Sequence, residues 1–462
     1  MAEPVFPHAA SSDGRPCDPD SDSPGACWFR PGRPVSASTV LRIRRCTMSP
    51  RSIFFSICAA FIAPLGTPAA TPHAPDSWTG ERVLGKKPNN EITFRGNENG
   101  KQVKFEFRGV YPIRVRDDRD GSLRIFDGHR EGWAKKSDFV LTRDAPAYFT
   151  DVIRANPADS FALTMRGLGW LYRGEYDNAI KDFTECIRID AGDADAFDNR
   201  GATWLAKKDY DRAIRDFDEA IRLDPKKARS FNNRGNARQG TKDYDRAIRD
   251  YDDAIRLDPK FAQVFNNRGN ARQGTKDYDR AIRDYDEAIR LDPNYALAFM
   301  NRAGAWSEKK DYDRAIRDYD EAIRLDPKNA QAFDARGDAW CDKKDYGRAI
   351  RDYDEAIRLD PGNADAFNGR AWLAATCPDA KYRDGAKAVS LAQKAIELAG
   401  KDADWYFSGT LAAAYAETGD FHRAVAEQEK VLSNKDLDGE DRAKAEKQLA
   451  LYRDRKPFRD DD

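Results

Sequence analysis

The sequence has 462 residues, of which 34% are charged, and its formal net charge at pH 7 is −1. Acidic and basic residues are interleaved without a basic block, which argues against binding to nucleic-acid phosphates. The four histidines do not have the spacing of metal ligands, and no Ser, Cys or HExxH motif of a known catalytic type occurs. The sequence therefore predicts a non-enzyme with no catalytic residues, no metal and no cofactor.

The first seventy residues contain two different segments. Residues 1–47 are rich in Pro, Ser, Asp and Arg without an apolar period, so we interpret them as a disordered extension, with Met48 as an alternative start of the protein. Residues 48–70 carry one positive residue near their start, Arg51, then a short apolar run, and they end in small residues. This is the pattern of a secretory signal peptide. The run is too short to span a membrane. We expect an exported, periplasmic or envelope-associated bacterial protein; the alternative is a disordered tail with an apolar patch.

Short strands are predicted over residues 78–143. In KQVKFEFR (101–108) apolar and charged residues alternate, as in a strand with one buried face, and Asp120-Gly121 favours a tight hairpin turn. The stretch SLRIFDGHREGWAKKSDFV (122–140) resembles bacterial SH3-like (SH3b) domains. The resemblance implies a small all-β SH3-like barrel that binds a peptide or a cell-wall component.

The remainder of the chain is repetitive. DYDRAIRDYDEAIRLDP (277–293) recurs unchanged at 311–327, and single-letter variants begin at 209, 243 and 345, always in a 34-residue register. Within 228–261 the apolar and small residues predict two helices, 228–240 and 243–257, and Pro259 cannot continue the second one. One such unit cannot bury its apolar face alone, whereas stacked copies bury a continuous core.

This unit resembles the tetratricopeptide repeat in its length, its small residues and its closing proline. We place about eight copies in residues 150–435 and a C-terminal capping helix at 439–458. The expected fold is mainly α, a right-handed tetratricopeptide solenoid behind the β unit. Position seven of the repeat is Arg where the family usually has Leu, as in Arg200 and Arg234. We expect these arginines to pair with neighbouring aspartates at i,i−3 or to reach the next repeat. The alternative is that several face the groove, in which case the partner carries an acidic segment.

The interleaved charges of the repeated helix predict a solvated surface rather than catalytic carboxylate pairs. We expect i,i+4 ion pairs there, namely Asp279 with Arg283, Asp286 with Arg290, and Arg283 with Glu287.

Two further motifs have simple interpretations. GNARQGTK (235–242) is similar to a phosphate-binding loop, but its last two residues are transposed and Gly235 falls inside a predicted helix. Cys186 occupies a position that other copies fill with Ala, which predicts a small buried thiol. For Cys341 and Cys377 we favour two free thiols over a disulfide between them.

Asparagines recur in the first helix of the repeats, which normally lines the concave surface of a tetratricopeptide solenoid. An amide both donates and accepts, so a ladder of amides can hold the backbone of an extended peptide. A similar ladder lines the repeats of protein O-GlcNAc transferases. The candidate partner-binding residues are Asn199, Asn232, Asn233, Asn236, Asn266, Asn267, Asn270 and Asn301. The alternative is that these amides hydrogen-bond within or between repeats.

The sequence as a whole predicts a non-catalytic scaffold that binds a protein or an extended peptide, with the β unit as a second binding module. Two other functions remain open. The chain could be an envelope structural protein that binds cell-wall glycan, or the regulatory subunit of an enzyme complex.

Overall fold

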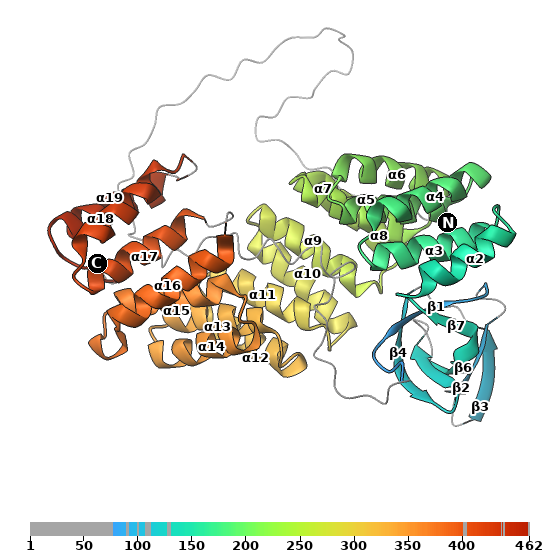
Figure 1. Cartoon of the computed structure of the whole chain (residues 1–462), viewed down its shortest axis with the longest axis horizontal. Coiled ribbons are helices and arrows are strands. Elements are labelled where there is room, and N and C mark those ends of the chain that lie inside the picture. The colour runs from blue at the N-terminus through green and yellow to red at the C-terminus, as the bar shows by residue number, and fades with distance from the viewer. Residues whose placement is uncertain are drawn as a thin grey trace, which may run out of the picture. The chain divides into compact units, whose positions relative to one another are not determined.

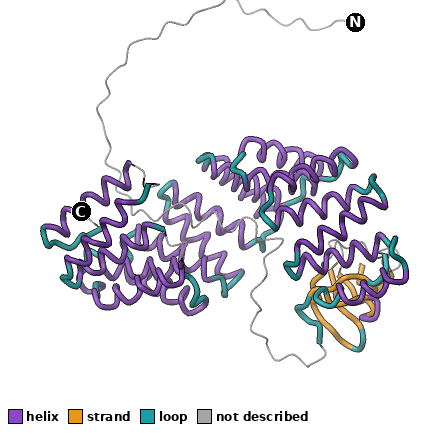
Figure 2. The backbone as a smooth tube through the Cα atoms, turned by 45° about the horizontal axis from the view of Figure 1, so that its top comes forward, coloured by secondary structure: helices purple, strands orange, loops and turns teal. Residues whose placement is uncertain are grey.

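The computed structural model describes residues 77–88, 92–98, 101–106, 112–126, 131–400, 404–435, 437 and 439–460 (Figure 1). The predicted extension and signal peptide, residues 1–70, lie outside this range. The described part begins with strands and continues with helices to its end, as the orange and purple segments of Figure 2 show. The predicted mainly α solenoid behind a small antiparallel sheet is confirmed.

Seven strands form one antiparallel sheet in the order β3-β2-β6-β5-β4-β1-β7. They are β1 (Arg82–Gly85), β2 (Thr93–Glu98), β3 (Lys101–Glu106), β4 (Ile113–Arg119), β5 (Ser122–Phe126), β6 (Glu131–Lys135) and β7 (Phe139–Leu141), with a short 3-10 helix, η3 (Lys136–Asp138), before β7. The predicted hairpin at Asp120-Gly121 joins β4 to β5, and both turn residues have positive φ. Alternate residues of β4 and β5 are buried, which is the predicted period of two. The SH3-like identity of this sheet stays a prediction.

The sheet and the first helices share a core. Leu84 of β1 and Val140 of β7 pack with Phe149 of α2 (Ala145–Ala155) and Met165 of α3 (Ser160–Tyr172). The β unit is therefore attached to the first repeat by buried apolar contacts as well as by the chain itself.

Eight helix pairs follow one another, each packed against the next. They are α3 with α4 (Tyr176–Ile189), α5 (Ala194–Ala206) with α6 (Tyr210–Leu223), α7 (Ala228–Gly240) with α8 (Tyr244–Leu257), α9 (Ala262–Gly274) with α10 (Tyr278–Leu291), α11 (Ala296–Glu308) with α12 (Tyr312–Leu325), α13 (Ala330–Asp342) with α14 (Tyr346–Leu359), α15 (Ala364–Thr376) with α16 (Gly385–Ala399), and α17 (Trp405–Glu417) with α18 (Phe421–Ser433). The extra residues of the seventh pair contain a 3-10 helix, η4 (Ala380–Tyr382). We call the first helix of each pair helix A and the second helix B.

Local sequence explains where each helix begins. In the third pair, Asp243 caps α8 by accepting a hydrogen bond from the backbone N–H of Arg246, and equivalent aspartates cap four other B helices of the repeated sequence. The turn before this cap places Lys242 at φ 62°. Gly235 of helix A lies against the ring of Tyr251, whose nearest carbon would be 2.6 Å from an added Cβ. The glycine therefore allows the two helices to approach closely.

The position-seven arginines join neighbouring repeats. Arg268 donates to Asp284, 16 residues further along in its own helix B, and to Asp252 of the preceding repeat. The carboxylate of Asp284 is buried, and the same double contact recurs at Arg234, Arg302 and Arg336. The predicted pairing at i,i−3 is wrong, because each arginine binds an aspartate 16 residues further along on helix B of its repeat. The predicted contact across a repeat boundary is found, but it is made to the preceding repeat.

The predicted i,i+4 ion pairs on the repeated helix are wrong. Asp279 binds Lys309 of the next repeat instead of Arg283, and Asp286 binds Arg302 instead of Arg290. Glu287 pairs with Arg290 at i,i+3 spacing instead of with Arg283. Asp279 and Asp286 have these partners because stacking brings cations of the next repeat close to them, whereas Glu287 keeps a partner on its own helix.

The C-terminal end closes the last repeats. Helix α19 (Gly439–Arg453) packs against α18, and it ends before the predicted boundary at residue 458. The chain then returns to α15, where Phe458 contacts Trp372 and the N–H of Asp460 donates to the carbonyl of Thr376. None of the helices in the described part of the chain is both long and apolar enough to cross a membrane.

Candidate functional site

The candidate asparagines form lateral hydrogen bonds between repeats. The Nδ2 of Asn267 donates to the Oδ1 of Asn232, at 3.0 Å, and to the Oδ1 of Asn236, at 3.1 Å. One repeat further on, Asn301 donates to Asn266 at 2.9 Å. An amide at position six of one helix A thus reaches position five of the preceding helix A, which is the inter-repeat alternative left open by the sequence.

Burial separates the eight candidates into two groups. Asn232 and Asn266 are each only 1% exposed, and three others are also buried, namely Asn267, Asn270 and Asn301. Asn199, Asn233 and Asn236 keep part of their surface exposed. In this conformation a partner can touch only the second group, and direct contact between these three and a peptide stays a prediction.

Further along the solenoid the same face of helix A becomes acidic. Helix α13 carries Asp334, Asp338 and Asp342 at four-residue spacing, so the three carboxylates share one side of the helix. Asp365, in the first turn of α15, lies near this stripe and accepts a hydrogen bond from the hydroxyl of Tyr406 on α17, at 2.9 Å. The sequence analysis missed this stripe, although DARGDAWCD shows it as three aspartates at four-residue spacing.

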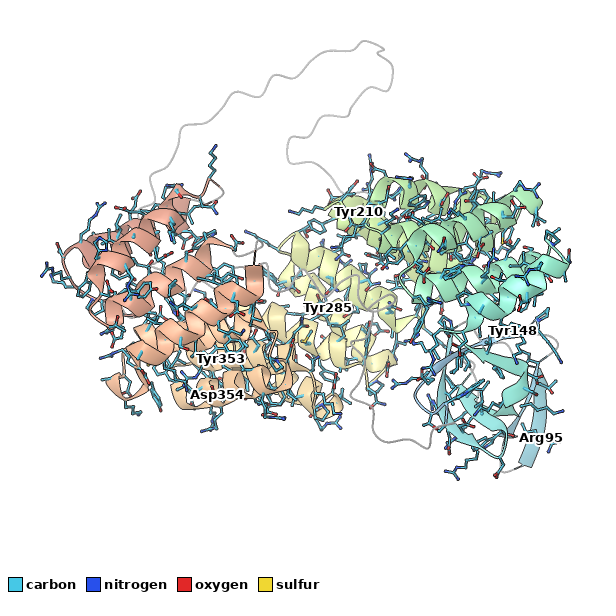
Figure 3. The ribbon with its side chains drawn as sticks, in the orientation of Figure 1. Arg95, Tyr148, Tyr210, Tyr285, Tyr353 and Asp354 are labelled. Atoms are coloured by element: carbon cyan, nitrogen blue, oxygen red, sulfur yellow. The ribbon has the colours of Figure 1, made fainter. Side chains whose placement is uncertain are left out.

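The pKa values of the three carboxyl groups in the acidic stripe are raised. Burial raises the pKa of Asp334 well above its usual range, and the charges of Asp338 and Asp365 raise it further. Burial raises the pKa of Asp338 to about 7, against a hydrogen bond from Tyr353 that favours the charged form. Tyr353 lies on the neighbouring helix α14, where Figure 3 labels it beside Asp354. Burial, followed by the charge of Asp460, raises the pKa of Asp342 to about 6.

A cavity open to solvent lies beside this stripe. It lies between α15, α17, α18 and α19 and is lined by Asn368, Trp372, Trp405, Tyr406 and Lys444, among others. Asn368 is 3% exposed, and its Oδ1 has no hydrogen-bond partner among the described residues. Since buried polar atoms are normally paired, this oxygen is available to a donor that enters the cavity. We call the cavity with Asp334, Asp338 and Asp365 the C-terminal site.

In the part of the chain that the structure describes, no three His, Cys, Asp or Glu side chains are grouped as metal ligands. Cys186 is free and buried, as predicted, and burial raises the pKa of its thiol. Cys341 and Cys377 are both free thiols as well, so the favoured state of this pair is the one observed.

Comparison with protein families identifies the repeats. Residues 232–295 and 266–330 match one model of the tetratricopeptide repeat, and residues 194–227 and 330–363 match a second one. The chain therefore contains tetratricopeptide repeats, as the resemblance predicted. No curated protein matches the chain.

Solved structures with a similar arrangement include several repeat proteins. The protein MamA is 23% identical, covers 36% of this chain and 96% of its own, and has a TM-score of 0.33. YrrB, described as a tetratricopeptide repeat protein with an unusual peptide-binding site, is 22% identical, covers 41% of this chain and 97% of its own, with a TM-score of 0.34. Yeast Tom70 is 21% identical and covers 64% of each chain, with a TM-score of 0.45.

Proposed function

We propose that the chain is an exported, non-catalytic scaffold that binds an extended peptide or a segment of a partner protein along its A helices. The C-terminal site anchors the partner, and the partly exposed asparagines of the earlier repeats contact the segment that continues from it. Tetratricopeptide repeats are generally scaffolds for protein–protein interaction, which supports this class of function. The β unit is then a second binding module.

The observation that carries the proposal is the cavity between the last repeats and α19. Trp372 and Trp405 come from the A helices of adjacent pairs, and both line the cavity and keep part of their surface exposed. Aromatic side chains at a solvent-open cavity supply large contact areas at a low cost in side-chain entropy, and they dominate the energetics of many interfaces. Asn368 adds an unpaired acceptor that fixes the orientation of a bound donor.

The hydrogen-bonded asparagines support this function indirectly. Asn267 uses both of its N–H groups in its lateral bonds to Asn232 and Asn236, so the buried amides act on the packing of the A helices and not on a partner directly. The lateral bonds also hold neighbouring A helices in a fixed register. A preorganised surface binds an extended chain with a smaller loss of entropy than a mobile one.

Selection of peptides from a random display library on the full chain tests the proposal. We expect the selected peptides to lose at least about tenfold in affinity for Trp405→Ala, which corresponds to about 1.4 kcal/mol. Trp204→Ala is the matched control, because Trp204 is also a partly exposed tryptophan of helix A but lies on α5, outside the cavity. Selected peptides that bind both variants as tightly as the wild type would refute binding at this site. Circular dichroism of each variant checks that the fold is retained.

Export is tested separately from binding. N-terminal sequencing of the chain from the secreted or membrane fraction should give a start near residue 70. A mature chain that begins before residue 48 would refute the signal peptide.

A further inference from the structure

Two aspartates that occupy the same repeat position have opposite surroundings. Asp198 and Asp334 both stand at position five of helix A, four repeats apart. Asp198 is completely buried and has two cations and one amide of the next repeat around it, although its Oδ2 accepts no hydrogen bond from the described residues. The Nε of Arg229 lies 2.9 Å from its Oδ2, and the Nδ2 of Asn233 lies 3.5 Å from its Oδ1. Lys227 contributes the second cation, at 3.9 Å.

At Asp334 each of these three donors is replaced. The position of Arg229 is taken by Asp365, the position of Asn233 by Gly369, and the position of Lys227 by Asn363. The guanidinium is thus replaced by a second carboxylate, and the amide by a residue without a side chain. At Asp198 two cations balance the charge of the carboxylate. At Asp334 the equivalent positions carry no cation.

The groups facing Asp334 do not supply the missing charge. They are Asp338 on its own helix, Asp365 on α15, and three tyrosines on other helices, namely Tyr319, Tyr353 and Tyr406. Tyr353 donates to Asp338 and Tyr406 donates to Asp365, but a neutral hydroxyl does not balance a carboxylate charge. Among the described residues, no Lys or Arg forms an ion pair with Asp334, Asp338 or Asp365. Burial together with this repulsion holds the pKa of Asp334 far above its usual range.

The adjoining cavity contains an independent sign of a missing ligand. Tyr406 belongs to both, because it lines the cavity and binds Asp365. In the cavity the Oδ1 of Asn368 is buried and accepts no hydrogen bond from any described residue. Asn368 stands at position five of the next helix A, one repeat after Asp334. Carboxylates and an unpaired amide oxygen are all acceptors, whereas the ring of Trp372 already has the ammonium group of Lys444 at 5.7 Å from its centre.

From this arrangement we infer that the C-terminal site receives a cationic side chain, a guanidinium or an ammonium group, from an extended segment of the partner. The cation takes the place that Arg229 has beside Asp198 and is bound by Asp334 and Asp365, and the rest of the segment enters the cavity towards Asn368. The carboxylates are not grouped as metal ligands in the described residues, which favours an organic cation. This inference rests on the proposed function, because it specifies the chemistry of the partner at the same site.

Binding of short, blocked, fluorescein-labelled peptides to the full chain tests the inference. One peptide carries several arginines among glycines and serines. A second carries lysines at the same places, and a third carries citrulline, which keeps the shape of arginine without its charge. We expect the arginine peptide to bind at least about tenfold more tightly than the citrulline peptide, and added salt to reduce this difference. A lysine peptide as tight as the arginine peptide assigns the site to charge alone, and a weaker one assigns it to the planar guanidinium.

Three variants locate the effect. Asp334→Asn should reduce the affinity of the arginine peptide to that of the citrulline peptide. The double variant Asp365→Arg/Gly369→Asn restores around Asp334 two of the three groups that surround Asp198, the guanidinium and the amide. It should therefore abolish the preference for arginine and raise the melting temperature. Asp245→Asn removes the same charge from an exposed position of α8 and should change nothing.

Several outcomes would overturn the inference. Equal binding of the arginine and citrulline peptides would do so, as would a preference for arginine that survives in Asp334→Asn. A loss in Asp245→Asn as large as that in Asp334→Asn would attribute the preference to overall charge. If peptides from the display selection keep their affinity for Asp334→Asn, the scaffold function stands and the cation site is removed.

Discussion

The arginine at position seven gives the sharpest prediction about stability. Arg302 donates from Nε and Nη2 to both oxygens of Asp318, at 2.8 and 2.7 Å, and from Nη1 to Asp286 of the preceding repeat. The side chains of Arg302 and Asp318 are 19% and 10% exposed, so the pair is largely removed from water. Replacing Arg302 by Ala leaves the carboxylate of Asp318 buried without a cation, and we expect a loss of about 3 kcal/mol.

A second repeat supplies the matched comparison. The equivalent Arg268 shares its partner Asp284 with Arg272, whose Nη1 lies 2.7 Å from the Oδ2 of that carboxylate. Arg268→Ala leaves this contact in place, and one charge-assisted hydrogen bond contributes about 1.5 kcal/mol. We therefore expect Arg268→Ala to cost roughly half as much as Arg302→Ala.

Hydrogen exchange measured by mass spectrometry is the appropriate assay, because stacked repeats open locally rather than in one step. The opening free energy of α11 and α12 should fall in Arg302→Ala, whereas the double variant Arg302→Leu/Asp318→Ala should recover most of the loss. A cost for Arg302→Ala below about 1 kcal/mol would contradict the argument, because that is the range of an exposed ion pair. A cost no larger than that of Arg268→Ala would contradict it as well.

Three further predictions concern single positions. The pKa of Asp334 is higher in the folded chain than in the unfolded chain, so the fold loses stability as pH rises above the pKa of the unfolded chain. Asp334→Asn should therefore raise the melting temperature at pH 8, and this gain should vanish near pH 4. Lys276, at φ 63°, is in the left-handed region, so Lys276→Gly should stabilise the chain by about 0.5–1 kcal/mol in thermal melts. Gly235→Ala would place Cβ 2.6 Å from the ring of Tyr251 and should cost about 1–3 kcal/mol in denaturant unfolding, whereas a neutral result would show that the ring can move aside.

The repeat architecture could be predicted from the sequence because the residues that begin, pack and end each helix recur in every copy of the repeated sequence. Asp243 as a cap, the alanines of helix B and a closing proline recur at fixed positions. The structure begins the helix after the aspartate, buries the alanines inside it and ends it two residues before the proline. The ion pairs could not be predicted in this way. A pattern read along one helix finds only the neighbours one turn away, whereas Asp279 finds its cation, Lys309, on the next repeat.

The candidate site was predictable only in part, for a similar reason. The asparagine ladder was visible as a period of 34, but a period does not reveal whether Asn266 faces a partner or its neighbour Asn301. The acidic stripe was harder to see because it interrupts the period. The stripe lies on α13, and Asp365 lies in the first turn of α15 in the next repeat. Only the fold brings Asp334 and Asp365 together.

The lateral contacts between A helices also explain why near-identical repeats stack in one order. At one boundary, Asn301 at position six donates to Asn266 at position five of the preceding repeat. At the next boundary, Ala335 at position six and Met300 at position five belong to one apolar cluster. Exchanging these repeats would place an amide against Met300 and leave a buried donor unpaired, at a cost of about 1–3 kcal/mol. The boundary after Asp334 follows neither rule, because the facing residue is Gly369. Position five therefore lacks a donor at Asp334 and again at Asn368, one repeat later, and a ligand that supplies the absent donors gains most there.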